Sequence, residues 1–89
     1  MGTHESHPDI LNRLKRAEGH LRRVIQMMES GSSCLEVAQQ MHAVSHALIN
    51  AKSVFIHDHI EHCLEHALEE NKKITKKDLQ EFKDISKYL

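Results

Sequence analysis

The absence of glycine and proline beyond Gly31 constrains the fold of this chain more than any other feature. All three glycines and the single proline lie within the first 31 residues, and these are the residues that most often interrupt a helix. Beyond Gly31, apolar residues recur at spacings of three and four, as on one face of a helix. We therefore predict one helix over about residues 33–70, roughly 55 Å long at 1.5 Å per residue. Such a length is typical of coiled coils and helical bundles.

A capping pattern marks the start of this long helix, because Ser33 is followed three residues later by Glu36. The apolar stripe predicted along the helix consists of Leu35, Ala38, Met41, Val44 or Ser45, Leu48, Ala51 and Phe55, continued by His59, Cys63 and Ala67. An apolar stripe of this kind has to be covered by another helix.

Two shorter helices are predicted on either side. The first covers about residues 8–30, with Pro8 in its first turn and Ser6 and Asp9 as a capping pair. Its predicted apolar stripe is Ile10, Leu14, Ala17, Leu21, Val24, Ile25 and Met28. The third covers about residues 75–88. It begins with the capping pair Thr75 and Asp78, and its apolar edge is Leu79, Phe82, Ile85, Tyr88 and Leu89.

The composition supports an all-α protein built from a three-helix protomer. Only one tyrosine, two phenylalanines and no tryptophan occur in 89 residues, so the helices must pack through aliphatic side chains. We predict a flexible tail over residues 1–7 and one helical domain over residues 8–89. A chain this short buries little core alone and needs a metal or a partner. Two cysteines make a poor disulfide framework, and no apolar run is long enough for a signal peptide or a membrane span. We therefore expect the protein in the cytoplasm.

Histidines concentrate in the stretch HDHIEHCLEH, residues 57–66, which also holds one of the two cysteines. His59 and Cys63 are spaced i, i+4, so they share one face of a helix on consecutive turns. The other cysteine, Cys34, stands at the start of the same helix. A continuous helix would separate Cys34 from His59 by roughly 37 Å, which no single metal ion can span.

A second copy of the long helix, packed antiparallel, would remove this separation. Cys34 of one chain would then lie beside His59 and Cys63 of the other, with the two-fold axis near Leu48. Symmetry would give two equivalent intersubunit metal sites in a four-helix dimer. The helix N-terminus would favour the thiolate form of Cys34.

Simpler interpretations exist for each of these residues. A buried cysteine such as Cys34 often serves only as a small apolar residue. His42 and His46 share the i, i+4 spacing and are interpreted as polar residues of the core or of an interface. Solvation on a helix surface explains the three other histidines of the stretch, His57, His62 and His66.

Basic residues cluster in the first helix although the net charge of the chain is −1. We expect a DNA-binding surface made of Arg13, Lys15, Arg16, Arg22 and Arg23, with Lys52 as a further candidate. These residues would contact phosphates and read DNA shape, because no recognition helix is identifiable from the sequence. A solvated outer helix face is the simpler alternative, and Lys72, Lys73, Lys76 and Lys77 form a second basic cluster.

Two segments give the chain a resemblance to the CsoR/RcnR family of small helical bacterial repressors. These are RLKRAEGHLRRVIQMMESGSSC (13–34) and DHIEHC (58–63), and the resemblance covers about residues 8–89. It implies an antiparallel dimer that assembles further into a dimer of dimers. In the copper branch a cysteine of one subunit joins a histidine and a cysteine of its neighbour, and Cys34, His59 and Cys63 match these positions.

The chain departs from the copper branch at several positions. Ser33 replaces a common tyrosine, His20 replaces the usual glutamine, and Leu79 stands near the expected glutamate of the third helix. Asp78 and Glu81 are therefore the candidates for a carboxylate behind the metal ligands. Formaldehyde sensors generally lack the cysteine at position 63, and persulfide sensors generally have a cysteine at position 59.

The native metal stays open between two readings. Two thiolates and one imidazole suit trigonal Cu(I). Nickel and cobalt members of the family recruit N-terminal nitrogen ligands, so His4, His7 or His20 could complete a set for Ni(II) or Co(II), with Zn(II) as a further candidate. One metal ion per subunit is expected in either case.

The resulting function is metal-responsive repression, in which the apo protein binds operator DNA and a bound metal releases it. The alternatives are a metal storage or chaperone protein without DNA affinity, and a formaldehyde-responsive member of the same family. A closed metal site and the lack of a catalytic triad or phosphate loop argue against an enzyme.

Overall fold

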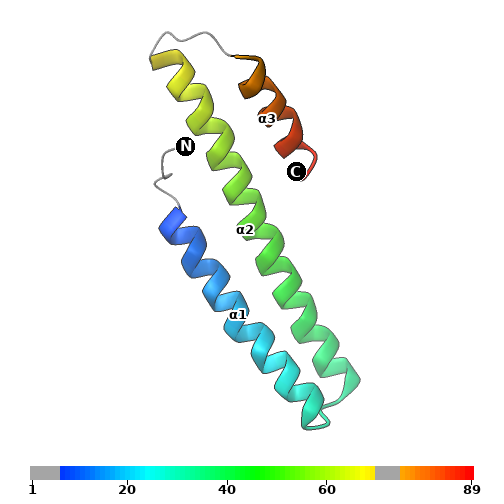
Figure 1. Cartoon of the computed structure of the whole chain (residues 1–89). Coiled ribbons are helices and arrows are strands. Elements are labelled where there is room, and N and C mark those ends of the chain that lie inside the picture. Colours follow the sequence, from blue (N-terminus) through cyan, green and yellow to red (C-terminus); the bar gives the residue numbers. More distant parts are fainter. Residues whose placement is uncertain (1–6, 70–74) are drawn as a thin grey trace.

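The computed structural model of the chain describes residues 7–69 and 75–89, without the side chains of residues 66–69. It contains three α-helices, α1 (His7–Glu29), α2 (Cys34–Glu69) and α3 (Lys76–Ser86), and no strand within these residues (Figure 1). The three helices and the all-α class predicted from the sequence are thus confirmed. α1 begins one residue earlier than predicted, at His7, whereas its predicted cap Ser6 lies outside the described residues.

α1 and α2 form an antiparallel hairpin whose turn is fixed by backbone hydrogen bonds. Gly31 adopts a φ of 79°, a left-handed conformation that glycine tolerates best. Its N–H donates to the carbonyl of Met28 at 3.3 Å, and the N–H of Ser32 donates to that of Met27 at 2.9 Å, so the last carbonyls of α1 are satisfied. Ser33 then caps α2, because its Oγ accepts from the backbone N–H of Glu36 at 3.2 Å.

The hairpin is held by small aliphatic residues spaced seven apart in each helix. This inner seam consists of Ile10, Ala17 and Val24 of α1 and Val37, Val44 and Ala51 of α2, all buried. Val24, 2% exposed, packs with Val37 and Val44. A repeat of seven keeps one seam facing the neighbouring helix, as in a coiled coil. Most of the core of the protomer is therefore a narrow strip between α1 and α2, and Ile56, 3% exposed, extends it toward the C-terminal end of α2.

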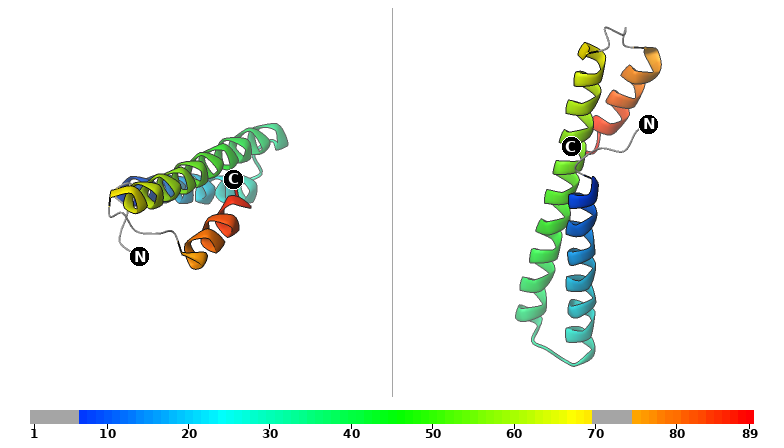
Figure 2. Two further views of the ribbon diagram at one scale, coloured as in Figure 1. Left: turned by 90° about the horizontal axis from the view of Figure 1, so that it is seen from above. Right: turned by 90° about the vertical axis from the view of Figure 1, so that its left-hand side faces the viewer.

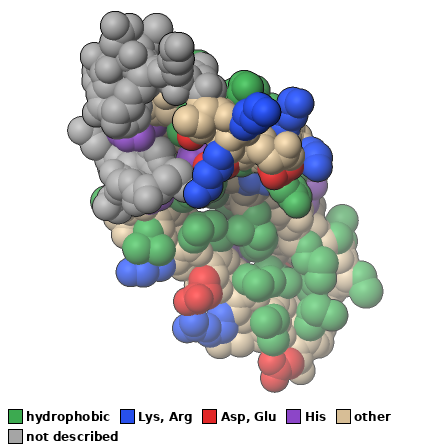
Figure 3. All heavy atoms as spheres, turned by 45° about the horizontal axis from the view of Figure 1, so that its top comes forward, with side chains coloured by type: hydrophobic (Ala, Val, Ile, Leu, Met, Phe, Trp, Pro, Cys, Tyr) green, Lys and Arg blue, Asp and Glu red, His purple; other side chains and the backbone are tan. Residues whose placement is uncertain are grey.

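A second apolar strip on the hairpin has no cover within the protomer. This outer seam consists of Leu14, Leu21 and Met28 of α1 and Met41, Leu48 and Phe55 of α2, each between 38% and 58% exposed. In each helix, every residue of the outer seam follows a residue of the inner seam by four positions. Because the two helices are antiparallel, the α1 half and the α2 half of the outer seam lie on the same side of the hairpin. Hydrophobic side chains accordingly make up much of the face seen in Figure 3.

The stripes predicted from the sequence mixed these two seams. Leu14, Leu21, Ile25 and Met28 are exposed although the prediction grouped them with the buried Ile10, Ala17 and Val24. In α2 the predicted Leu35, Met41 and Leu48 are exposed, whereas the buried Val37 was missed. The reason is that both seams follow helical spacing.

α3 lies beside the C-terminal part of α2, whereas α1 lies beside the N-terminal part (Figure 2). The predicted capping box is present: Asp78 N–H donates to Thr75 Oγ1, and Thr75 N–H donates to the Asp78 carboxylate, both at 3.1 Å. None of the residues of α3 is buried. None of the described helices is long and apolar enough to cross a membrane.

Candidate functional site

His59 and Cys63 form a contact pair near the C-terminal end of α2. The His59 Nε2 and Cys63 Sγ atoms are 3.6 Å apart, as expected for side chains on consecutive turns. His59 is buried, at 5% exposure, whereas Cys63 is exposed. A buried imidazole beside an accessible thiol can therefore offer two donor atoms to one incoming ion.

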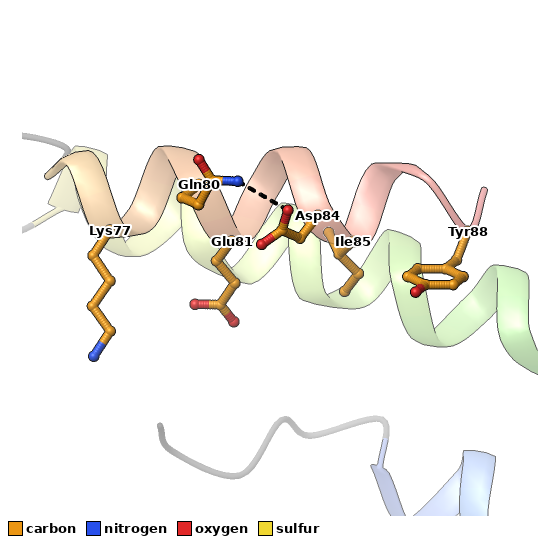
Figure 4. Close-up of a pocket in the computed structure, with 6 residues that line it drawn as sticks. All are labelled: Lys77, Gln80, Glu81, Asp84, Ile85 and Tyr88. Carbon is orange, nitrogen blue, oxygen red and sulfur yellow. Dashed lines mark hydrogen bonds between the residues drawn. The ribbon is translucent and has the colours of Figure 1, made fainter.

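Glu81 of α3 closes one side of this pair. Its carboxylate lies 3.3 Å from His59 Nε2, the same ring nitrogen that faces the Cys63 thiol, so a metal ion bound to Nε2 would have to replace this contact. Figure 4 shows Glu81 among the residues that line a hollow along one side of α3: Lys77, Gln80, Glu81, Asp84, Ile85 and Tyr88. Of the two carboxylates predicted behind the ligands, Glu81 contacts His59, and Asp78 closes the cap of α3.

The surroundings of Cys63 disfavour the thiolate form of its side chain. Partial burial raises the pKa of Cys63, and the negative charges of Glu81 and Asp78 raise it further. Because the thiolate is the form that binds metal, an ion entering this site must displace a proton. The same carboxylates also lower the electrostatic cost of bringing in a cation.

The distance within this pair fits a shared metal ion. A metal bonded to nitrogen at about 2.0–2.1 Å and to sulfur at about 2.3 Å can bridge atoms up to about 4.4 Å apart, and the observed separation is 3.6 Å. The pair is nevertheless incomplete, because no group of three or more potential metal ligands occurs within the described residues of the protomer.

Cys34 lies at the opposite end of α2 from this pair. The helix is continuous from Cys34 to Glu69, so roughly 37 Å of helix separates Cys34 from His59. The structure therefore does not bring the predicted Cys34, His59 and Cys63 together within one protomer. Cys34 is exposed, and it falls seven residues before Met41, in register with the outer seam.

The additional histidine candidates are placed apart from one another. The His7 ring stacks on Phe55, with ring centroids 5.3 Å apart, one turn before His59. His20 Nε2 lies 2.6 Å from the side-chain oxygen of Gln40. With Nε2–H as the donor, the neutral ring keeps a lone pair on Nδ1. His4 lies outside the described residues. Sequence reasoning missed Gln40, because no local pattern connects residues 20 positions apart.

The predicted DNA-binding residues are all exposed. At 3.6 residues per turn, Lys15, Arg16, Arg22 and Arg23 lie at least about 100° around α1 from the buried Ala17. These four residues therefore occupy the face of α1 turned away from α2.

Carboxylates already engage two of the predicted cations. Arg13 pairs with Asp9 at 3.0 Å, and Arg22 pairs with Glu18 at 3.3 Å. Both pairs join exposed residues one helical turn apart, and such pairs contribute little stability, so a phosphate could displace the carboxylates. Lys52 is also exposed, but it stands on α2, three residues before the Phe55 ring that stacks on His7 at the start of α1.

Known proteins place the chain in a defined family. Residues 6–88 match the family model described as metal-sensitive transcriptional repressor. The chain is 45% identical over 58 residues to the copper-sensing transcriptional repressor CsoR of Mycobacterium ulcerans (strain Agy99), a match that covers 65% of this chain and 50% of the relative. CsoR of Bacillus subtilis (strain 168) is 37% identical over 59 residues, or 66% of this chain and 58% of the relative. The matched stretch thus spans only about half the length of these relatives.

A solved structure extends the likeness to the whole chain. The nickel-responsive transcriptional regulator InrS has a TM-score of 0.78 and 32% sequence identity, over 100% of this chain and 99% of that one. The family model alone covers far more than half of the residues. The chain therefore belongs to the metal-sensitive transcriptional repressor family, as the two sequence segments predicted.

Proposed function

We propose that this protein is a metal-responsive repressor whose metal site is shared between two copies of the chain. Cys34 of one protomer joins the His59 and Cys63 pair of its partner, and the reciprocal site forms at the other end of an antiparallel dimer. The supporting observation is that the close pair, 3.6 Å apart, lacks a third ligand among the described residues of its own protomer. The remaining thiol stands at the far end of the same continuous helix.

The outer seam supports this arrangement. Its six exposed apolar residues form one strip along the hairpin, which water alone covers in an isolated protomer, so a second hairpin is the expected cover. Cys34 shares the register of Met41, Leu48 and Phe55, and His59 follows Phe55 by one turn. Packing two outer seams antiparallel about Leu48 would thus carry each Cys34 toward the partner's pair. Two such dimers would form the tetramer.

The metal supplied to this site is a soft or borderline transition ion. Two thiolates and one imidazole suit Cu(I), and a further nitrogen would suit Ni(II) or Co(II), with Zn(II) as a weaker candidate. The copper-sensing relatives support the Cu(I) hypothesis, and the nickel-responsive InrS supports the Ni(II) hypothesis. His20 joins His4 and His7 as a candidate for this further nitrogen, because a neutral ring that donates from Nε2 to Gln40 at 2.6 Å carries its lone pair on Nδ1.

Operator DNA is the proposed partner of the outer face of α1. Four cations share that face, and nearly the whole length of α1 packs on α2. Metal binding would connect the N-terminal end of one α2, at Cys34, to the C-terminal part of the other α2, at His59 and Cys63. This connection would change the relative position of the two α1 helices in a dimer. Repression is then relieved if the ion binds more tightly to the arrangement of the two α1 helices that has low affinity for DNA. Such a protein would act in the cytoplasm.

Mixed dimers test the shared site. Cys34→Ala chains are mixed with Cys63→Ala chains, allowed to exchange, and titrated anaerobically with Cu(I) and separately with Ni(II). Each hybrid dimer should regain one tight site of two, although neither parent binds tightly. The Cys34→Ala variant alone should keep the DNA affinity of the metal-free protein, because the basic residues on the outer face of α1 are unchanged. It should not release DNA when metal is added. Release at the wild-type metal concentration would refute the sensor assignment.

The same titrations separate the competing functions. In Arg16→Ala the salt dependence of operator binding should flatten by about one unit for each phosphate interaction removed, whereas the exposed control Lys83→Ala should leave it unchanged. Several metals per chain without DNA affinity would indicate a storage protein instead. A response to formaldehyde that needs Cys34 but no metal would indicate the formaldehyde branch. Substituting His4 and His7 with alanine should spare release by Cu(I) but impair release by Ni(II).

A further inference from the structure

A second pair of metal-binding side chains lies on the middle turns of α2. His42 and His46 are both exposed, and their ring centroids are 4.4 Å apart with an interplanar angle of 59°. The sequence interpretation was that both are polar residues of the core or of an interface. In the protomer they do not belong to the core, because neither ring is buried.

The pair is separate from the inner seam and from the His59 and Cys63 pair. Val44, midway between the two histidines, is buried against Val24 and Val37. At about 100° per residue, His42 and His46 each lie about 160° around α2 from Val44, so they face away from α1. His59 is 13 residues beyond His46, or about 20 Å along the helix. Cys34, the ligand that this chain would give to the other shared site, is eight residues before His42, or about 12 Å. The proposed Cys-His-Cys sites and this pair therefore cannot share one metal ion.

The spacing of the pair is one that helices use to hold metals. Two histidines at i and i+4 present their rings on one face, as in the zinc-binding HExxH pattern. One ion bonded to two imidazole nitrogens at about 2.0–2.1 Å requires the nitrogens to be about 2.9–3.4 Å apart. The nitrogens lie at the edge of each ring, so rings with centroids 4.4 Å apart reach this separation by rotation of the side chains.

We propose that His42 and His46 form a second metal site on each protomer, bidentate and selective for a borderline divalent ion such as Zn(II), Ni(II) or Cu(II). The donors are two imidazoles without a thiolate, a set that suits these ions better than soft Cu(I). Ala43 stands where the HExxH pattern has its glutamate, so the site has no general base and serves binding rather than hydrolysis. This proposal does not depend on the repressor function.

The two sites would respond to different ions. Thiolates make the intersubunit site tight, whereas two imidazoles and solvent ligands make the surface site weaker. An ion there also bridges consecutive turns of α2 and so stabilises the middle of the helix. The surface site would therefore fill only when divalent ions are abundant.

Site-resolved NMR of the full chain tests the proposal. In a Cys34→Ala, Cys63→Ala background, which removes the thiolate donors, Zn(II) is titrated while the ring nitrogens of the histidines are followed. The His42 and His46 signals should shift together and saturate at one Zn(II) per protomer for this pair. His42→Gln should weaken Zn(II) binding at His46 at least about tenfold. His57→Gln, a matched exposed change on the same helix, should leave both signals as before.

Three results would overturn the proposal. One is a His46 response to Zn(II) that His42→Gln leaves unchanged, because the two rings would then bind independently. Another is the absence of any shift at both rings while other histidines saturate. The third is saturation at one Zn(II) per two protomers, which would make the pair half of an interface site. Circular dichroism checks that each variant keeps its helix content.

Discussion

The two ends of the molecule are built on different principles. At the Gly31 end, α1 and α2 are joined by a short turn and packed through the inner seam, where Val24 is 2% exposed. At the other end, α3 has no buried residue, and the half-buried Glu81 carboxylate lies 3.3 Å from His59 Nε2. The first end maintains the protomer. The second has fewer buried residues, Ile56 and His59 of α2 among those described, so a ligand or a partner can change it at a lower cost.

A charge placed on the outer seam should have the largest effect on this contrast. Leu48→Lys should abolish dimer formation, because the proposed two-fold axis would bring two ammonium groups into one apolar interface. We expect a loss of at least about 3 kcal/mol, or more than a hundredfold in the dimerisation constant. Analytical ultracentrifugation measures this effect. Gln39→Lys adds the same charge on an exposed face of α2 and should leave the dimer intact. An unaltered dimer in Leu48→Lys would move the interface elsewhere.

Truncation of the inner seam should have the next largest effect. Val24→Ala removes two methyl groups from a buried site and should cost roughly 2 kcal/mol of unfolding free energy. Urea denaturation followed by circular dichroism measures the loss. Gln39→Ala on the surface should change stability by no more than about 0.5 kcal/mol. If both variants were equally stable, the hairpin would not depend on this seam.

Loss of the α3 cap should have a smaller and local effect. Thr75→Ala removes the acceptor of the Asp78 N–H bond and should cost about 1 kcal/mol of helix stability. Hydrogen exchange should accelerate in α3 while the amides of α1 remain protected. Equal acceleration in α1 and α3 would show that the two ends unfold as one unit and are not independent.

The smallest effect should be a change in the titration of Cys63. Burial, Glu81 and Asp78 raise the pKa of this thiol, so Glu81→Gln should lower it. A raised thiol pKa favours the folded state at pH values below the unfolded pKa, and this contribution is lost as the pH rises through the folded pKa. Alkylation rates against pH in a Cys34→Ala background measure the shift. Asp84→Asn, also on α3, should leave the pKa unchanged. A pKa that rises in Glu81→Gln would contradict this assignment.

Local patterns were sufficient to predict several features. The i, i+4 spacing predicted the closeness of His59 and Cys63, and the capping pair Thr75 and Asp78 predicted the start of α3. The lack of glycine and proline predicted the length of α2. In each case the interaction lies within four residues of the chain or depends on one helix alone.

Features that depend on the neighbouring helix were not predictable. Two seams with the same repeat run along α2, and the repeat alone does not say that Val37 faces α1 while Met41 stays uncovered. The orientation of α3 toward α2 was likewise not predictable, and the structure shows the Glu81 carboxylate 3.3 Å from His59 Nε2. The pairing of Cys34 with a second chain is a proposal for the same reason.

The unbroken course of α2 from Cys34 to Glu69 makes it a lever as well as a scaffold. Its 36 residues extend about 54 Å, so a tilt of about 5° around its midpoint would swing each tip by about 2.4 Å. A small change of angle at one metal site of the proposed dimer would thus produce an equal displacement at the opposite tip of α2, where the second proposed site would lie. The two metal sites of the proposed dimer would then be coupled through the rigid tilt of α2, without a chain of side-chain contacts between them.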